Sequence, residues 1–209
     1  MSYHEENTKC LRNFHNHVKY QLLETGVNHI KTEMNNDTHI QLLDIGVGRG
    51  GDMQKWNKLG IKSVIGIDID KGYITEARNR YKENENMKDT KYLFYVSNIN
   101  EPLNRSIYII GKHTQMFQII SCQFALHYYF GNTYILNNLI NDISSKLVKG
   151  GLFVGTVCEG SEILKLCGNN SYYQNTAIHI HKCFDKPKGV GDLIKFTMSG
   201  TLYFGENLV

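Results

Sequence analysis

Residues 42–52 read LLDIGVGRGGD, an apolar run that leads directly into a glycine-rich loop. A helical pattern follows at residues 51–59. Glycine adopts backbone conformations that are closed to other residues, so this order is typical of a strand, a tight turn and a helix N-terminus that approaches a ligand closely. The stretch therefore predicts a strand over 40–46 whose carboxyl end carries a binding loop.

A second signal lies downstream, where VIGID at residues 64–68 predicts another strand, over 62–68, that ends in Asp68. A carboxylate about 20 residues past a glycine loop is suited to accept hydrogen bonds from ribose hydroxyls. A glycine loop alone is often only a turn. The loop and the acidic strand end, inside one β-α-β rhythm, together predict a nucleotide-type pocket.

The rest of the chain alternates strand and helix patterns. Apolar spacing and turn residues predict helices over 8–25, 51–59, 70–84, 132–147 and 160–167, and strands over 40–46, 62–68, 92–97, 116–122, 152–157, 178–184 and 193–199. Thr8 and Asp70 are the expected N-caps, and Gly26 is the expected end of the first helix. We expect a loop over 98–115 and a turn over 149–151. This alternation predicts an α/β fold with a mostly parallel sheet, helices on both of its faces and right-handed crossovers.

Polar side chains stand at the ends of four successive predicted strands. The glycine loop and Asp68 follow the first two strands, Asn98 follows the third and Gln123 the fourth. In an open α/β sheet, ligands bind outside the carboxyl ends of the strands, where the strand order reverses. Four polar groups in this arrangement predict a binding site at that edge of the sheet.

The composition limits the class of protein. A chain of 209 residues, 41% of them hydrophobic, suits one domain, and a net charge of +3 permits only a local contact with nucleic acid. The five cysteines are scattered without a CxxC pair, which supports neither a zinc knuckle nor a disulfide framework. His179 and His181 alternate on a predicted strand without a third ligand, so we expect no metal site.

Targeting signals are also lacking in this sequence. Residues 1–9 are polar, which argues against a signal peptide. No apolar run reaches the roughly 20 residues that are needed to span a bilayer. We therefore expect a protein that is neither secreted nor bound to a membrane.

Three classes of nucleotide-type pocket compete for the glycine loop. A dehydrogenase would use GxGxxG spacing, which residues 46–51 do not fit cleanly, and a P-loop enzyme would need Gly-Lys-Ser/Thr, which is absent. An S-adenosylmethionine methyltransferase needs glycines for close approach, an acidic strand end for the ribose, and loops after the third and fourth strands around the adenine. The methyltransferase interpretation fits best, with a Rossmann-like class I fold.

Four segments resemble the viral and eukaryotic mRNA cap guanine-N7 methyltransferases. They are LRNFHNHVK at 11–19, similar to LRNFNNWxK; LDIGVGRGGDMQKW at 43–56, similar to LDLGCGKGGDLxKW; SCQFALHYYF at 121–130, similar to SCQFxxHYxF; and GGLFVGT at 150–156, similar to GGxFxGT. The first and third are distinctive, because methyltransferases in general lack them. The resemblance implies one methyltransferase domain over 1–209, with a helical segment at 1–30, a cofactor-binding core at 40–157 and a cap-binding region at 158–209.

The resemblance also implies roles for individual residues. The cofactor would be bound by Lys19, Asp44, Gly46, Gly48, Asp68, Asn98, Gln123 and Tyr128. Within this set, Lys19 would reach the methionine carboxylate, Asp68 the ribose and Asn98 the adenine. The cap guanosine would be bound by Arg12, His15, Asn16, His127, Tyr128 and Glu206, the last from a segment similar to PExLV. Arg12, Lys55 and Lys58 are candidates for the triphosphate by position.

The implied reaction needs no catalytic acid or base. N7 of guanine presents a lone pair in the ring plane, so it attacks the methyl group without prior deprotonation, and alignment supplies the catalysis. The implied partners are capped RNA and further capping-enzyme domains or subunits. The implied location is the cytoplasm, in a virus factory, for a viral protein and the nucleus for a cellular one.

Three features depart from the family pattern. Asn98 stands where an Asp is usual, His15 replaces the first Asn of an Asn-Asn pair, and the sequence ends at Val209 before an expected further helix and strand. Two alternatives therefore remain open. One is a class I methyltransferase with a protein or small-molecule acceptor, and the other is a non-catalytic cofactor- or RNA-binding fragment of a larger capping protein.

Overall fold

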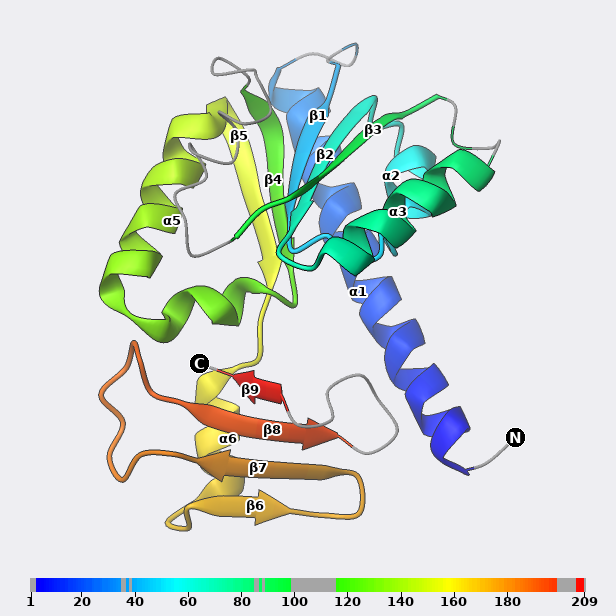
Figure 1. Ribbon diagram of the computed structural model, residues 1–209. Helices are drawn as coiled ribbons and strands as arrows, with labels where there is room; N and C mark the ends of the chain where they lie inside the picture. The colour runs from blue at the N-terminus through cyan, green and yellow to red at the C-terminus, as the bar shows by residue number, and fades with distance from the viewer. Residues whose placement is uncertain are drawn as a thin grey trace.

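Figure 1 shows the computed structural model of the chain, which describes residues 3–34, 37, 39–84, 87, 89–98, 116–198 and 206–208. Its elements, in chain order, are α1 (Tyr3–Glu33), β1 (Gln41–Ile45), α2 (Met53–Lys58), β2 (Ser63–Asp68), α3 (Lys71–Glu83), β3 (Lys91–Val96), β4 (Phe117–Gln123), the 3₁₀ helix η2 (Leu126–Gly131), α5 (Thr133–Lys146), β5 (Leu147–Thr156), α6 (Gly160–Cys167), β6 (Tyr172–Gln174), β7 (Ile178–Lys182), β8 (Ile194–Met198) and β9 (Glu206–Leu208). They form two sheets with helices packed on them.

The larger sheet has the strand order β3-β2-β1-β4-β5, and every described pair in it is parallel. Its strands are apolar on both faces because helices cover both sides. One core cluster joins α1, α2 and α3 to the sheet through Leu23, Trp56 and Ile74, all fully buried. A second cluster joins η2 and α5 to the opposite face through Tyr129 and Leu139. The predicted doubly covered α/β sheet is confirmed (Figure 1).

The strand order reverses at β1, which pairs with β2 on one side and with β4 on the other. The connections that leave β1 and β4 therefore diverge, and in open α/β sheets the ligand crevice lies at such a point, outside the carboxyl ends of the strands. The glycine loop follows β1, and Gln123 is the last residue of β4. The fold thus places two of the predicted site segments side by side.

The smaller sheet has the antiparallel order β6-β7-β8-β9. Helix α6 packs on one of its faces, where Ile163 and Cys167 contact Ile180 and Phe196 in a third core cluster. The connection between β7 and β8 touches η2, because the Gly191 amide donates a hydrogen bond to the Phe130 carbonyl oxygen over 2.7 Å. This contact fixes the smaller sheet beside the carboxyl ends of the central strands (Figure 1).

Helix α1 is longer than predicted. It runs from Tyr3 to Glu33, so the expected N-cap Thr8 and the expected end at Gly26 are both wrong. The helix continues through Gly26 because Leu23, Val27 and Ile30 are buried against the sheet on either side of it. A β-carbon at Gly26 would lie 3.7 Å from side-chain atoms of Ile119 and Val154, an ordinary van der Waals distance, so this part of the helix lies directly on the sheet. Tertiary packing outweighs the helix-ending tendency of glycine.

The other elements differ from the sequence predictions mainly in their short strands. Residues 172–174 form β6 and residues 206–208 form β9, and neither strand was among those predicted. The predicted turn at 149–151 lies within β5, whose register against β4 is broken between Phe117 and Ile119. Asp70 is the predicted N-cap of α3, and its side chain accepts a hydrogen bond from the Tyr73 amide. Most of the predicted loop at 98–115 lies outside the described residues.

Candidate functional site

The glycine loop makes two close approaches at the end of β1. Gly46 has φ +75°, and a β-carbon there would lie 2.5 Å from the Ala125 β-carbon, so only glycine fits between the loops that follow β1 and β4. Gly48 has φ +54°, and a β-carbon there would meet no atom within 4 Å. The backbone of the loop is therefore open to a ligand on the Gly48 side.

Asp68 meets the glycine loop directly. Its Oδ2 accepts a hydrogen bond from the Gly48 amide over 2.8 Å, and its Oδ1 accepts one from the Asp70 amide over 2.9 Å. A carboxylate offers about four acceptor positions, so these two backbone donors orient the group and leave acceptor capacity for ligand hydroxyls. The predicted pairing of the loop with the acidic end of β2 is thus present in the structure.

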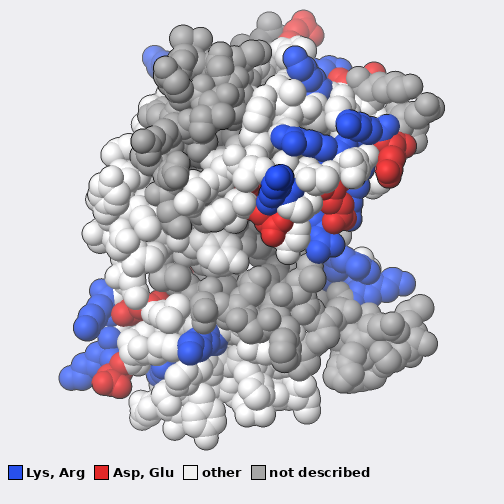
Figure 2. Space-filling model, in the orientation of Figure 1, with Lys and Arg blue, Asp and Glu red and all other residues white. Residues whose placement is uncertain are grey.

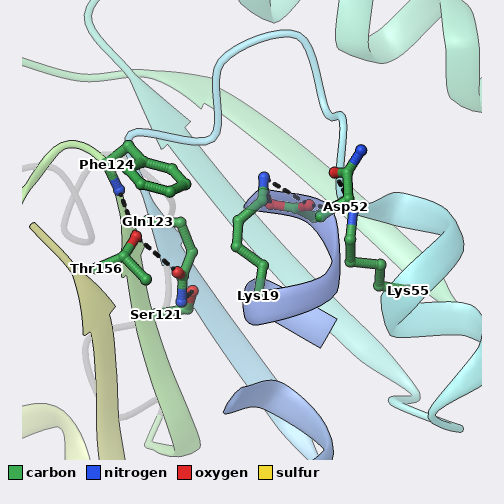
Figure 3. Close-up of polar contacts among 8 residues, drawn as sticks. Lys19, Asp52, Lys55, Ser121, Gln123, Phe124 and Thr156 are labelled. Atoms are coloured by element: carbon green, nitrogen blue, oxygen red, sulfur yellow. Dashed lines mark hydrogen bonds and ion pairs between the residues drawn. The ribbon is translucent and has the colours of Figure 1, made fainter. Parts of the chain in front are cut away.

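Lys19 of α1 forms an ion pair with Asp52, the last residue of the glycine-rich stretch (Figure 3). Its Nζ lies 2.8 Å from Oδ1 and 2.9 Å from Oδ2 of Asp52. Lys55 contacts the same carboxylate, with its Nζ 2.7 Å from Oδ1, and donates a second hydrogen bond to Asn16 Oδ1 over 2.9 Å. The two lysines, Asp52 and Asn16 form one network that joins α1 to α2. Sequence reasoning did not single out Asp52, although it stands at the end of the glycine stretch.

Asp44, in β1, is a buried carboxyl group with an unused acceptor. It is 3% exposed, and its Oδ1 has no hydrogen-bond partner among the residues that the structure describes. Burial, followed by the nearby Asp52 carboxylate, raises the pKa of Asp44 to about 8. A ligand ammonium group suits such an oxygen, because it supplies the missing hydrogen bond and its positive charge would favour the ionised form of the carboxyl group.

Gln123 and Phe124 are held by Thr156 at the end of β5 (Figure 3). The Thr156 hydroxyl donates to Gln123 Oε1 over 3.0 Å and accepts from the Phe124 amide over 3.0 Å. Phe124 has φ +57°. A positive φ is uncommon for a residue with a side chain, and residues that adopt it are often found at functional sites. The Gln123 side chain is almost fully buried, so in this structure it organises the loop after β4.

His15 packs on the ring of Phe124, with 4.4 Å between ring centroids. Lys19 Nζ lies 5.9 Å from the centroid of the same ring. Burial, followed by the positive charge of Lys19, lowers the pKa of His15 below its usual value. The His15 ring is therefore neutral near pH 7, and it links α1 to the loop that follows β4.

His127 and Tyr128 lie in η2, two and three residues after Ala125, with their ring centroids 4.1 Å apart. His127 is 5% exposed, its Nε2 has no hydrogen-bond partner within the described part of the chain, and burial lowers its pKa. Tyr128 is 38% exposed and presents its ring at the surface. The pair combines a buried polar ring with an accessible aromatic one.

Four predicted residues remain. Arg12 on α1 and Asn98 after β3 are exposed. Lys58 packs on an aromatic ring, with its Nζ 4.9 Å from the centroid of Tyr20. The backbone of Glu206 pairs with Phe196 in β9, but its side chain lies outside the described residues. The structure therefore gathers Lys19, Asp44, Gly46, Gly48, Asp68 and Gln123 at one edge of the sheet, with His15, Asn16, His127 and Tyr128 on the elements that border it.

Two residues of the glycine-rich segment and the helix after it lie away from this edge. Arg49 pairs with a carboxylate, with its Nη1 3.3 Å from Glu76 Oε2. Trp56 is fully buried. No helix in the described ranges has the length and apolarity that a membrane crossing requires.

Comparison with known proteins places the chain in a family. Residues 4–184 match the mRNA (guanine-N(7))-methyltransferase domain. The chain is 33% identical over 160 residues to the mRNA cap guanine-N(7) methyltransferase of Schizosaccharomyces pombe, which covers 74% of this chain and 41% of that protein. It is 30% identical over 187 residues to the protein of the same name from Meyerozyma guilliermondii, covering 79% of this chain and 32% of that one. It thus spans less than half the length of these relatives.

The fold has solved counterparts. An S-adenosylmethionine-dependent methyltransferase from Clostridium acetobutylicum superposes with a TM-score of 0.57 over 97% of this chain and 78% of that one. At 17% identity this likeness concerns the fold alone, and it agrees with the predicted class I methyltransferase architecture. The sequence match covers most of the chain and includes all four segments on which the resemblance rested, so the chain belongs to the mRNA (guanine-N(7))-methyltransferase family.

Proposed function

We propose that this chain transfers a methyl group from S-adenosylmethionine to N7 of the guanosine cap of mRNA. The proposal rests on the hydrogen bond between the Gly48 amide and Asp68 at the carboxyl ends of β1 and β2, and on the Asp44 Oδ1 in β1 that has no partner among the described residues, in a chain that matches this family. Loop residues Gly46 and Gly48 allow a ligand to approach the backbone.

The residues at the crevice fit the cofactor group by group. Asp68 has acceptor capacity left for ribose hydroxyls, and Asn98 follows β3 on the adenine side. The unused Oδ1 of Asp44 suits the ammonium of the methionine part, and Lys19 suits its carboxylate. S-adenosylmethionine, when bound, supplies an electrophilic methyl group on a sulfonium. Gln123 and Tyr128 complete the proposed cofactor contacts.

The acceptor needs positioning instead of activation. Guanine N7 carries its lone pair in the ring plane, so no residue has to remove a proton before attack. His15 and His127 both have lowered pKa values, so near pH 7 they add no positive charge beside a ring that becomes cationic on methylation. Alignment of N7 with the methyl group and its leaving sulfur supplies the rate gain, as in other reactions accelerated by proximity.

The proposed cap contacts come from three elements. His15 and Asn16 lie on α1, His127 and Tyr128 on η2, and Glu206 on β9. A carboxylate at Glu206 would accept hydrogen bonds from the guanine N1 and N2 donors, and the exposed Tyr128 ring would stack on the base, which is how proteins read unpaired RNA bases. Arg12, which is exposed on α1, would contact the anionic bridge.

The same proposal extends to partners and place of action. The substrate would be the GpppN end of an RNA, and further capping-enzyme domains or subunits would act beside this one. A viral protein would work in cytoplasmic virus factories, and a cellular one in the nucleus.

The direct test uses labelled S-adenosylmethionine and GpppA-capped RNA, followed by nuclease digestion to identify the labelled nucleoside. Label in 7-methylguanosine is the expected result. The control substrate is the same RNA with its cap already methylated at N7, which should take up no label. Label on the control RNA, or transfer to protein or small molecules in its place, would contradict the proposed acceptor.

A further inference from the structure

Among the residues that the structure describes, one face of the smaller sheet is left uncovered. Helix α6 covers the other, where Tyr173, Ile180 and Phe196 lie in the third core cluster. Because side chains alternate along a strand, the neighbours of these residues point away from α6. In Figure 1 the open side of β6, β7 and β8 is turned toward the viewer, with α6 behind.

The strand register sets the side chains of this face in two rows. Tyr172 of β6 stands opposite His181 of β7, which stands opposite Lys195 of β8. The next row joins the same three strands through Gln174, His179 and Thr197. Neighbouring strands lie about 4.8 Å apart, so each row is a continuous line of side chains across the sheet. We call these six residues the open face.

The open face has the chemistry of a surface for single-stranded RNA. Tyr172 is 63% exposed, and His179, His181 and Lys195 are exposed as well. None of the six residues is a carboxylate, so the only full charge on the face is positive. Figure 2 shows uncharged surface with isolated basic atoms over β6, β7 and β8 in this view. Aromatic and imidazole rings stack on unpaired bases, and a lysine meets the phosphates.

The open face is also linked to the element that carries the proposed cap contacts. The β7–β8 connection holds η2 through the Gly191 amide and the Phe130 carbonyl oxygen, 2.7 Å apart. Tyr128 lies two residues before Phe130 in the same element. The smaller sheet therefore lies beside the element to which the cap is proposed to bind.

We propose that the open face binds the first unpaired nucleotides of the transcript downstream of the cap. This inference rests on the proposed function, because it treats the cap as anchored near η2. Tyr172 and the two histidines would stack on bases, and Lys195 would contact a phosphate. Such contacts are sequence-tolerant, which suits an enzyme whose substrates share only their 5′ end.

Steady-state kinetics of methyl transfer distinguish the contribution of the open face to substrate binding from that of the cap site. The substrates are the GpppA dinucleotide and a GpppA-capped single-stranded RNA of about 16 nucleotides, the upper end of what one small RNA-binding sheet covers. Tyr172→Ala should raise KM for the capped RNA about fivefold or more, since one stacked base contributes at least that much. Its kcat/KM for the dinucleotide should stay at the wild-type value.

Matched controls exclude general effects of surface substitution. Tyr134→Ala removes an equally exposed tyrosine from α5, at 70% exposure, and Lys62→Ala removes an exposed lysine before β2. Both should leave KM for the capped RNA unchanged. Lys195→Ala should also lower the salt dependence of RNA affinity, reducing the slope of log K against log salt by about 0.7.

A direct measurement of RNA binding tests the open face without relying on catalysis. Anisotropy of a labelled, uncapped RNA of the same sequence is measured with the wild-type protein and with Tyr172→Ala and Lys195→Ala. Weaker binding by both variants, with the controls unchanged, is the expected result. Equal affinity of variants and wild type would overturn the proposal for the open face. Absence of methyl transfer to both substrates by a wild-type protein that still binds RNA through these residues would instead contradict the proposed function.

Discussion

Lys19 and Asp52 lie 33 positions apart in the chain, yet the lysine Nζ sits 2.8 Å and 2.9 Å from the two carboxylate oxygens. Lys55 shares the same carboxylate. Side-chain exposures of 16% for Lys19 and 9% for Asp52 leave little water to replace either partner. This network fixes the middle of α1 against the glycine-rich stretch, and so positions Asn16 and His15 at the crevice.

Asp52→Ala should destabilise the protein strongly. The substitution leaves two partly buried lysines without their anion, and removal of one partner from such a pair costs about 3 kcal/mol of unfolding free energy. Urea denaturation measures the loss. Glu162→Ala is the control, because its ion pair with Lys165 is 61% and 71% exposed and should contribute less than about 1 kcal/mol. Equal losses in the two variants would show that the Asp52 network does not hold α1 in place.

Asp68→Ala should abolish binding of S-adenosylmethionine, measured by calorimetry. The substitution removes the proposed ribose acceptor and also frees the Gly48 and Asp70 amides that the carboxylate orients. Loss of charged hydrogen bonds worth about 1.5–3 kcal/mol each predicts a fall in affinity of at least about tenfold. Asp70→Ala is the control, because it removes an exposed acid that caps α3 and does not reach the glycine loop in the described contacts. Unchanged affinity in Asp68→Ala would contradict the ribose assignment.

The local part of the site could be predicted from the sequence because its signals are local. Gly46 follows β1 directly, and the contact with the Ala125 β-carbon explains why a glycine is needed there. Asp68 ends β2, and parallel pairing of β1 with β2 brings it to the Gly48 amide. Apolar runs, turn residues and the β-α-β rhythm were sufficient to predict this arrangement.

The remaining features of the fold and of the site depend on contacts between distant parts of the chain. The length of α1 is set by packing around Gly26 on β4 and β5, which no local pattern reveals. The role of Asp52 as partner of two lysines needs the positions of α1 and α2 together. Strand β6 is three residues long and exists through its pairing with β7, so the sequence analysis did not predict it.

Stability should fall as pH rises because of Asp44. Its pKa is raised to about 8 in the folded protein, against an ordinary value of 3.8, so the folded state holds a proton that the unfolded state has released between these values. The contribution of this proton to the free energy of unfolding is complete below about pH 4 and is lost as the pH rises toward 8. The free energy of unfolding falls by up to about 1.4 kcal/mol per pH unit in this range. In Asp44→Asn, the free energy of unfolding measured with urea should decline less steeply from pH 5 to 8. The same slope in variant and wild type would show that Asp44 is ionised in the folded protein.

Glu206→Ala should separate cap recognition from cofactor binding. The proposed carboxylate contact is made only with guanine, so affinity for S-adenosylmethionine should be unchanged while kcat/KM for the GpppA dinucleotide falls about tenfold or more, as expected for a lost charged hydrogen bond. Glu162→Ala on α6 removes an exposed acid away from the crevice and should leave turnover unchanged. Normal turnover in Glu206→Ala would refute the cap-pocket assignment.

His15 offers a test in which charge alone changes. Burial and Lys19 lower its pKa, so the ring stays neutral down to a pH below its usual value of 6.5 and becomes cationic only in more acidic solution. Protonation would place a charge beside Phe124, Lys19 and a guanine that becomes positive on methylation, so methyl transfer should fall on the acidic side. His15→Asn should remove this decline relative to its own activity at pH 7, because its amide has no charge to gain. The measurement is kcat/KM for the GpppA dinucleotide from pH 5 to 7, with His179→Asn as the control, since His179 lies on the open face. An identical acidic decline in His15→Asn would assign the titration to another group, with His127 as the next to test.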